Sequence, residues 1–329
     1  MLRSMYSGIS GLKNFQTKLD VIGNNIANVN THGFKKGRVI FKDLMSQTQA
    51  GASGPSLGAG GINAKQVGLG ATIAAIDTIH GTGSRQFTGR VLDIAIQGEG
   101  FFVVGKLAGD DVDETLVDGF TGTAYTRAGN FYRDREGFIV NSNGDYVIGW
   151  MPEIDGELPD GATDGMVNPD GPIIGHSPLQ GDDPEEIGEL IWNNDEGLQT
   201  EDVEGGRIYI PADAQEMSIG EDGVVTYVSA EGILTFAGQI MMATFPNAEG
   251  LTKVGNNYFQ VSANSGPTMF GAGSSFGIGQ TVSSALEMSN VDLSEEFTEM
   301  IVAQRGFQAN TRIITTSDEI LQELVNLKR

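Results

Sequence analysis

A seven-residue apolar repeat at both ends of the chain constrains the fold more than any other feature. Near the carboxyl end, apolar residues recur at every seventh position: Leu293, Met300, Phe307, Ile314 and Leu321. Near the amino end, the same spacing holds for Met5, Leu12, Leu19 and Ile26, with Phe15, Ile22 and Val29 three places after the last three. This period is typical of a helix that packs along another helix. We therefore expect long amphipathic helices over roughly residues 2–30 and 293–327.

Local signals predict where these helices start and end. Asp292 followed three residues later by Glu295 is a capping-box pattern, which predicts a helix start at Leu293. Asn30–Gly33 predicts a glycine cap at the end of the first helix. The second helix would be about 50 Å long. Its apolar stripe is widened at both ends by Phe297, Ile301, Leu324 and Val325, and polar residues dilute its middle.

Two arrangements of these helices remain open. They can form an antiparallel pair that closes one globular domain. Alternatively, they become stable only when they pack against further copies of the chain, because two such helices packed only on each other leave much apolar surface in water.

The middle of the chain has the alternation of β-strands. Leu92, Ile94 and Ile96 alternate, and Gly98–Val104 continues as the entry to a strand. Asn143-Gly144 predicts a hairpin with both turn residues at positive φ. Strands are also expected at Val224–Val228 and Gly238–Phe245. Residues 35–72 begin with a short helical patch at Phe41 and Leu44 and continue as a glycine-rich stretch, expected to be either a flexible linker or a connector that orders on assembly.

Composition and charge exclude several classes of protein. The 329 residues carry a formal net charge of -23 and no cysteine, so neither disulfides nor thiolate metal sites are available. Residues 105–205 carry 24 acidic and 4 basic side chains, which argues against nucleic acid or anionic lipid as the main ligand. The amino terminus lacks the apolar run of a cleaved signal peptide, and no stretch reaches membrane-spanning length. We expect neither nucleic-acid binding nor membrane insertion.

No pattern of catalytic or metal-binding residues is present. His32, His80 and His176 are far apart in the sequence, and there is no phosphate-binding loop or nucleophile motif. Paired acids such as Asp182-Asp183 could serve a glycosidase, but adjacent acids in Gly/Pro-rich loops are usually a solvated face. We expect no enzyme activity, no cofactor and no metal site, with a secreted acidic glycan-binding or glycan-cleaving β protein as the remote alternative.

Four stretches resemble a known family. They are Gly23–Lys36, Ala124–Phe131, Leu286–Phe297 and Ile301–Asn310. They are similar to signatures of the axial proteins of the bacterial flagellum, the rod and hook subunits. The motif residues that carry the resemblance are Asn24, Asn25, Asn28, Gly33, Phe34, Asn290, Asp292, Gln304 and Arg305.

The resemblance implies an α+β multi-domain fold, with long terminal helices in a coiled-coil-like axial domain and β-rich outer domains. The implied domains are 1–33 with 287–329 (axial helices), 34–72 with 276–286 (connector), 73–148 with 206–275 (β-rich inner and middle domain) and 149–205 (an inserted acidic outer module). The assembly interface would consist of Met5, Leu12, Phe15, Leu19, Ile22, Ile26, Leu293, Phe297, Met300, Phe307, Ile314 and Leu321.

The resemblance also implies a function. The closest similarity is to hook subunits, which polymerise into a curved hollow tube that transmits torque from rod to filament; a distal rod subunit is the alternative. The implied partners are further copies of the chain, the distal rod protein, the hook cap, the hook–filament junction protein and the flagellar type III export apparatus. The implied location is the extracellular flagellum, reached by export without a cleaved signal peptide.

Overall fold

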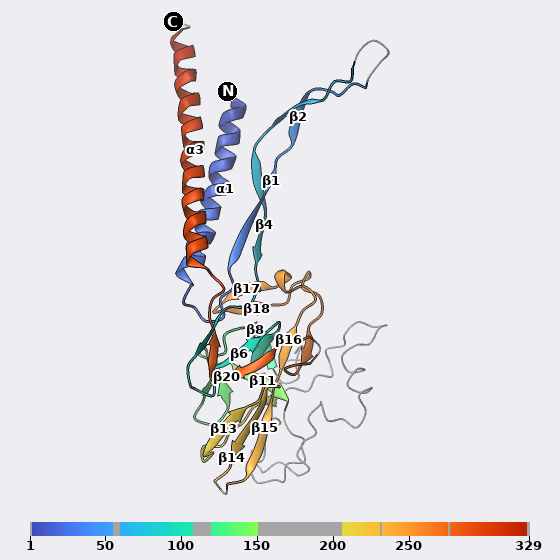
Figure 1. Ribbon diagram of the computed structural model, residues 1–329, viewed down its shortest axis with the longest axis vertical. Coiled ribbons are helices and arrows are strands. Elements are labelled where there is room, and N and C mark those ends of the chain that lie inside the picture. The colour runs from blue at the N-terminus through green and yellow to red at the C-terminus, as the bar shows by residue number, and fades with distance from the viewer. Residues whose placement is uncertain are drawn as a thin grey trace. The chain divides into compact units, whose positions relative to one another are not determined.

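The computed structural model describes residues 2–54, 60–107, 120–150, 206–230, 232–275 and 277–327. The chain forms two compact units (Figure 1). Unit 1 comprises Met1–Val29, Lys35–Ile79 and Val291–Arg329, and unit 2 comprises Asn30–Phe34 and His80–Asn290. The predicted acidic module at 149–205 lies almost entirely outside the described residues, as do the acid pairs considered above. No helix in the described ranges is long and apolar enough to cross a membrane.

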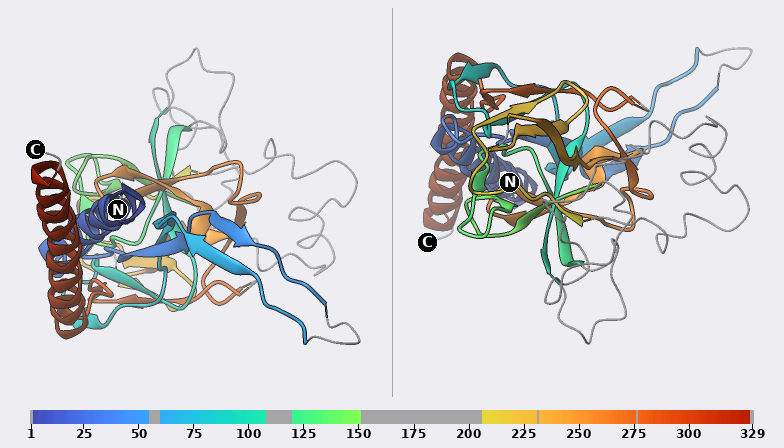
Figure 2. Two further views of the ribbon diagram at one scale, coloured as in Figure 1. Left: turned by 90° about the horizontal axis from the view of Figure 1, so that it is seen from above. Right: turned by 90° about the horizontal axis from the view of Figure 1, so that it is seen from below.

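Unit 1 contains two long helices and a β-hairpin. Its elements are α1 (Leu2–Ala27), α3 (Leu293–Asn326), β1 (Gly37–Asp43), β2 (Ser46–Ala50), β3 (Lys65–Gly68) and β4 (Ala71–Thr78). β1 pairs antiparallel with β4, and β2 with β3. Within this unit, α1 lies between α3 and the β1–β4 hairpin (Figures 1 and 2), and the Phe15 ring of α1 lies 6.3 Å from that of Phe41 on β1.

The structure confirms both terminal helices and corrects the predicted end of the first. The Asp292 side chain caps α3 by accepting hydrogen bonds from the backbone N–H groups of Ser294 and Glu295. The reciprocal half of the capping box is absent, because the Glu295 carboxylate pairs with Lys36 at 2.8 Å. The predicted glycine cap is wrong: α1 ends at Ala27, and Gly33 belongs to unit 2.

The predicted helical patch at Phe41 and Leu44 is also wrong. Phe41 lies in β1, and the backbone N–H of Leu44 donates to the carbonyl of Gly70 across the hairpin. Val39, Ile40 and Phe41 are residues that favour strands, and Ala71–Thr78 supplies the partner strand. A partner that is distant in sequence therefore overrides the weak helical periodicity.

Unit 2 is rich in β-strands. Its strands are β5 (Arg85–Phe87), β6 (Ile94–Gln97), β7 (Phe101–Leu107), β8 (Phe120–Thr126), β9 (Tyr132–Arg133), β10 (Ile139–Val140), β11 (Tyr146–Trp150), β12 (Gly206–Arg207), β13 (Glu216–Ile219), β14 (Val224–Val228), β15 (Leu234–Ile240), β16 (Met242–Thr244), β17 (Thr252–Gly255), β18 (Tyr258–Gln260), β19 (Met269–Gly271), β20 (Gln280–Ser283) and β21 (Ala285–Glu287), with a 3-10 turn, η2 (Ala248–Gly250). The largest sheet runs in the order β13-β14-β15-β11-β7-β8-β18-β17. The predicted strands at Val224–Val228 and within Gly238–Phe245 are confirmed.

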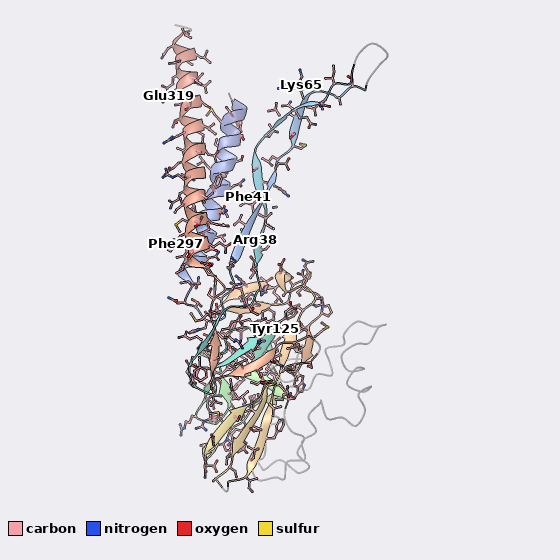
Figure 3. All side chains as sticks on the ribbon, viewed as in Figure 1. Arg38, Phe41, Lys65, Tyr125, Phe297 and Glu319 are labelled. Atoms are coloured by element: carbon pink, nitrogen blue, oxygen red, sulfur yellow. The ribbon has the colours of Figure 1, made fainter. Side chains whose placement is uncertain are left out.

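Two hydrophobic cores lie on either side of β7. Phe102 and Val104 pack in one core, and Phe101 and Val103 pack in the other. Because side chains alternate between the two faces of a strand, a strand covered on both faces needs a continuous apolar run. The sequence Phe101–Val104 meets this requirement. Tyr125 of the adjacent strand β8 is fully buried in the second core (Figure 3).

The turn at Asn143-Gly144 forms, but with different chemistry from the prediction. Only Gly144 has positive φ, at 85°, while the Asn141 side chain accepts hydrogen bonds from the backbone N–H groups of Asn143 and Asp145. Consecutive positive φ values occur instead between β17 and β18, at Asn256 (52°) and Asn257 (61°), directly after Gly255 (102°). Asparagine tolerates this conformation better than most residues.

Candidate assembly interface

The two helices of unit 1 pack antiparallel along a seam of small residues. A Cβ at Gly11 would lie 2.7 Å from the Asn310 Nδ2, and a Cβ at Gly306 would lie 2.5 Å from the Phe15 ring. Gly8 similarly faces Ile314. Glycine therefore permits a close approach of the backbones at three successive levels of the seam.

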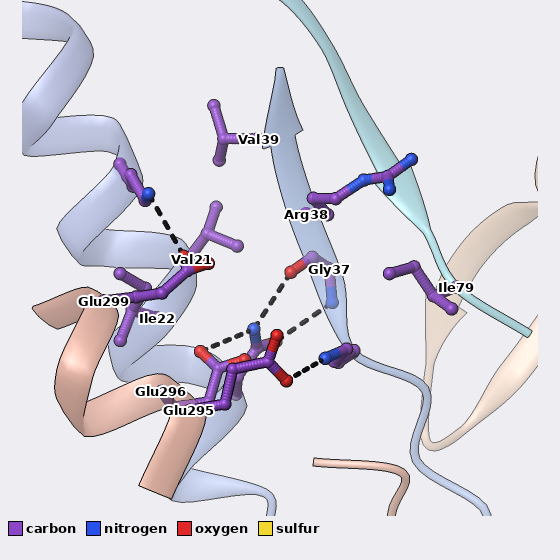
Figure 4. Close-up of a pocket in the computed structure, with 12 residues that line it drawn as sticks. Val21, Ile22, Gly37, Arg38, Val39, Ile79, Glu295, Glu296 and Glu299 are labelled. Carbon is purple, nitrogen blue, oxygen red and sulfur yellow. Dashed lines mark hydrogen bonds and ion pairs between the residues drawn. The ribbon is translucent and has the colours of Figure 1, made fainter. Parts of the chain in front are cut away.

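The seam becomes polar where α1, α3 and β1 meet (Figure 4). Asn25 makes two hydrogen bonds to the backbone of Gly37: its Nδ2 donates to the carbonyl at 2.9 Å, and its Oδ1 accepts from the N–H at 3.0 Å. The same Nδ2 donates to the Glu296 carboxylate at 3.2 Å. A cavity of about 140 Å³ lies at this place. Asn25 thus ties the first helix both to the hairpin and to the last helix.

Glu296 is a buried carboxylate in this polar group. Burial raises its pKa, and the neighbouring Glu299 and Glu295 add to this effect. The hydrogen bond from Asn25 and the charge of Lys36 oppose it. Two ion pairs flank the site, Lys18 with Glu299 at 3.1 Å and Lys36 with Glu295 at 2.8 Å.

The structure divides the predicted interface residues between the inside and the outside of unit 1. Ile22 is buried, and the residues that are half-buried are Met5, Leu12, Phe15, Leu19, Ile26, Met300, Ile314 and Leu321. Leu293, Phe297 and Phe307 are exposed. The stripe of the first helix is therefore largely satisfied within the chain, whereas part of the stripe of the last helix is not.

α3 exposes more apolar side chains than the seven-residue stripe predicts. We define the outer α3 surface as Leu293, Phe297, Ile301, Val302, Phe307, Ile313, Ile320, Leu324 and Val325, all of which are exposed. Phe297 projects from the helix near its start (Figure 3). The sequence interpretation missed Val302, Ile313 and Ile320, because they lie off the repeat. A helical period of 3.6, tested for a second apolar face, would have identified them.

Unit 1 has almost no hydrophobic core of its own. Among its described residues, the buried apolar side chains are Ile22, Val291 and Ala303, while the buried polar ones are Asn14, Asn25, Lys35, Glu296 and Ser317. The hairpin adds further exposed apolar groups, notably Met45 at 84% and Ile62 at 62% exposure. Most helical stability in proteins comes from packing an apolar face. Unit 1 leaves much of that face uncovered.

The remaining motif residues of unit 1 have local roles or face outward. The Asn28 side chain donates to the carbonyl and to the side-chain oxygen of Asn24, which stabilises the last turn of α1. Gln304 and Arg305 are exposed on α3. Their positions leave both side chains accessible to another molecule.

The segment Asn30–Phe34 is bound to unit 2. Gly33 has φ of 70°, and a Cβ there would lie 2.6 Å from the backbone nitrogen of Ala128. The Asn257 side chain donates to the carbonyl of His32 at 3.0 Å. Lys253 lies over the Phe34 ring at 5.1 Å, and burial lowers the pKa of this lysine. The motif Gly33-Phe34 therefore serves to dock the chain, not to cap a helix.

A buried ion pair lies beside this docked segment. Arg127 and Glu287 approach to 3.3 Å, and both side chains are at most 2% exposed. Arg127 also donates to the carbonyl of Gly98 at 2.8 Å and stacks over Phe101. Burial lowers the pKa of Arg127, and Glu287 counteracts this. The pair joins two of the signature stretches, which are 160 residues apart in sequence.

Comparisons with protein families match three parts of the chain. The family "Flagella basal body rod protein" matches residues 5–35, "Flagellar hook protein FlgE/F/G D1 domain" matches 95–175, and "Flagellar basal body rod FlgEFG protein C-terminal" matches 282–327. A crystal structure of Helicobacter pylori flagellar hook protein FlgE2 matches 62% of this chain and 100% of its own, at 12% identity and a TM-score of 0.36.

Relatives of two kinds match the whole chain. The flagellar basal-body rod protein FlgG of Bacillus subtilis is 49% identical, with 100% of both chains covered. The flagellar hook proteins FlgE of Borreliella burgdorferi and Treponema pallidum are 33% and 29% identical, again over 100% of each chain. The chain belongs to the family of bacterial flagellar rod and hook proteins.

Proposed function

We propose that this chain is a self-polymerising structural subunit of the flagellar axis, in which the outer α3 surface packs against unit 1 of neighbouring copies. The observation that supports this is the composition of unit 1, which buries more polar than apolar side chains and exposes a run of large apolar ones along a single helix. Removing exposed apolar surface of this kind from water stabilises the complex that buries it. A second copy of the chain supplies a matching surface in a helical polymer.

In the proposed polymer, the terminal helices form a coiled-coil-like axial layer, and the β-rich part forms the outer layers. The domain limits inferred from the sequence apply: axial helices, a connector, a β-rich inner and middle domain, and an inserted acidic module. The neighbours along the axis would be the distal rod protein, the hook cap and the hook–filament junction protein. The subunit would leave the cell through the flagellar export apparatus and act outside it, without enzymatic activity.

Two places along the axis are candidates. We favour the hook on the resemblance of the sequence, which assigns the long acidic stretch at 149–205 to an inserted outer module. The rod is the second candidate, because the relative with 49% identity is a rod protein. Antibody labelling of isolated basal bodies distinguishes them: label on the curved segment supports the hook, and label on the straight shaft supports the rod.

The test of polymerisation uses the double variant Phe297→Asp/Ile301→Asp. These two residues are exposed and four positions apart on α3, so they lie on one face of the helix. We expect the purified variant to keep its circular dichroism spectrum and a melting temperature close to that of the wild type, because Phe297 and Ile301 are 49% and 59% exposed. In cells that express only this variant, we expect isolated basal bodies to lack the structure that the subunit forms.

The matched control is Gln308→Asp/Thr311→Asp, which introduces the same two negative charges at exposed polar positions of the same helix. We expect this variant to assemble normally. Normal assembly of the double variant would contradict the proposed interface.

A further inference from the structure

Three segments of unit 2 are continuous in sequence with unit 1. Glu287 belongs to one of these segments and is hydrogen-bonded to the other two. The segments are residues 30–34, 80–84 and 287–290, beside which the chain passes from one unit to the other. The backbone carbonyl of Glu287 accepts from the N–H of Gly33 at 2.9 Å. Its side-chain Oε1 accepts from the N–H of Gly83, also at 2.9 Å. Glu287 therefore holds the first two segments to the third.

Further hydrogen bonds close the same group. The N–H of Met288 donates to the carbonyl of Ser84 at 2.8 Å, and the N–H of Asn290 donates to the carbonyl of Phe34 at 3.4 Å. The Asn290 side chain donates to the carbonyl of Gly81 at 3.3 Å. Each connecting segment is thus bonded to the stretch 287–290 by backbone groups.

The packing around Glu287 leaves no room for larger residues. A Cβ at Gly83 would lie 1.9 Å from the carbonyl oxygen of Met288. The second carboxylate oxygen of Glu287, Oε2, pairs with Arg127, which in turn donates to the carbonyl of Gly98, the residue that follows β6. Removing one partner from a buried ion pair leaves an uncompensated charge, which is strongly destabilising. The pair therefore anchors the three segments to the core of the β unit.

We infer that Glu287 and Arg127 are positioning residues that fasten all connections between the two units at one place on unit 2. The ion pair holds the three segments in place. Gly33 and Gly83, which lack a side chain, let their backbones approach those of Ala128 and Met288. The inference concerns the single chain, so it holds whether or not the chain polymerises.

The test is hydrogen exchange on the full-length chain carrying Glu287→Gln or Arg127→Met. We expect the amides of Gly33 and Gly83 to exchange at least about tenfold faster than in the wild type, because local opening needs less free energy than global unfolding. We expect the amides of β7 and β8 to keep their protection. Arg127→Lys, which keeps the charge, should restore part of the protection of Gly83.

The control is Arg207→Met, which removes another buried arginine of unit 2, stacked over Phe138 at 4.3 Å. We expect this variant to leave unchanged the ratio of the exchange rates of the Gly33 and Gly83 amides to those of the β7 and β8 amides. Equal acceleration of segment and core amides in Glu287→Gln would overturn the inference, as would unchanged exchange at Gly83. If Glu287→Gln does not fold, Glu287→Asp, which keeps the charge on a shorter side chain, gives the same comparison.

Discussion

At the residue scale, glycines and buried polar groups decide where backbones meet in this protein. A Cβ at Gly129 would lie 1.6 Å from the carbonyl oxygen of Ile94, and one at Gly306 would meet the Phe15 ring. The first neighbour is backbone inside the β unit, which cannot move aside, whereas the second is a side chain. Replacing the two glycines therefore has different consequences.

We expect Gly129→Ala to destabilise unit 2 by about 3 kcal/mol or more, because the new methyl group overlaps a fixed carbonyl in a packed region. Chemical denaturation followed by near-ultraviolet circular dichroism measures this. Gly220→Ala is the control: its Cβ would meet only ordinary contacts at 3.8 Å. A loss of stability below 1 kcal/mol for Gly129→Ala, roughly the size of a typical single substitution, would contradict the close contact.

The buried carboxylate of Glu296 should make the thermal stability of unit 1 depend on pH. Because burial raises its pKa in the folded state, its favourable contribution is complete below the unfolded pKa and is lost as the pH rises through the folded pKa. We expect helix melting temperatures to fall as the pH rises from 4 to 7, and Glu296→Gln to weaken this dependence and raise the value at pH 7. Circular dichroism at 222 nm measures both.

The matched control for this experiment is Glu295→Gln, which affects the adjacent, exposed carboxylate and its ion pair with Lys36. Exposed ion pairs contribute little to stability, so we expect the melting temperature to change only slightly, in either direction. A Glu296→Gln variant that melts lower than the wild type at pH 7 would show that the ionised carboxylate stabilises unit 1.

At the element scale, α3 is only partly covered within unit 1. One face packs against α1 through Gly306 and Ile314 and buries Ala303, and the apolar residues of the outer α3 surface lie on both sides of that face. In unit 2, by contrast, the strand β7 is covered by a hydrophobic core on each of its two faces. Short turns link these strands, and their backbone conformation selects the residues that occupy them.

The turn between β17 and β18 makes this testable. Asn256 has φ of 52°, where a β-branched residue is disfavoured. We expect Asn256→Val to destabilise unit 2 by about 1–2 kcal/mol, and Asn256→Gly to leave stability unchanged or slightly raised. Denaturant midpoints for the two variants measure the difference. Equal midpoints would mean that the turn adopts another conformation in solution.

At the scale of the whole molecule, the two units differ in how they are stabilised. Unit 2 contains both hydrophobic core clusters, with residues such as Phe102 and Tyr125 fully buried. Unit 1 depends on helix seams, a polar group around Asn25 and an exposed apolar helix. The stable part and the part proposed to assemble are therefore separate regions of one chain.

Deleting residues 293–329 tests this separation. We expect the β signal in circular dichroism to persist, with a melting temperature within about 4 °C of the wild type, the shift that about 1 kcal/mol produces in a domain of this size. We expect α1 to lose helicity, because its partner is gone, and assembly in cells to stop. Polymers formed by the truncated chain would refute the role of the last helix.

Local patterns in the sequence were sufficient for the elements. The seven-residue repeats predicted both helices, the Asp292 cap predicted the start of α3, and the alternation of Leu92, Ile94 and Ile96 predicted the strand β6. These signals succeed because helix and strand periods are properties of neighbouring residues. The family signatures were equally visible, and full-length relatives confirm the family.

Only the tertiary structure decided which residues meet across the chain. It placed Gly33 against Ala128, paired Arg127 with Glu287, and turned the expected helical patch at Phe41 into a hairpin strand. It also divided the apolar residues of α3 between a covered face and exposed positions beside it. The physical reason is that the spacing of apolar residues depends only on the helix or strand in which they lie. Burial and ion pairing depend on a partner that is distant in the sequence.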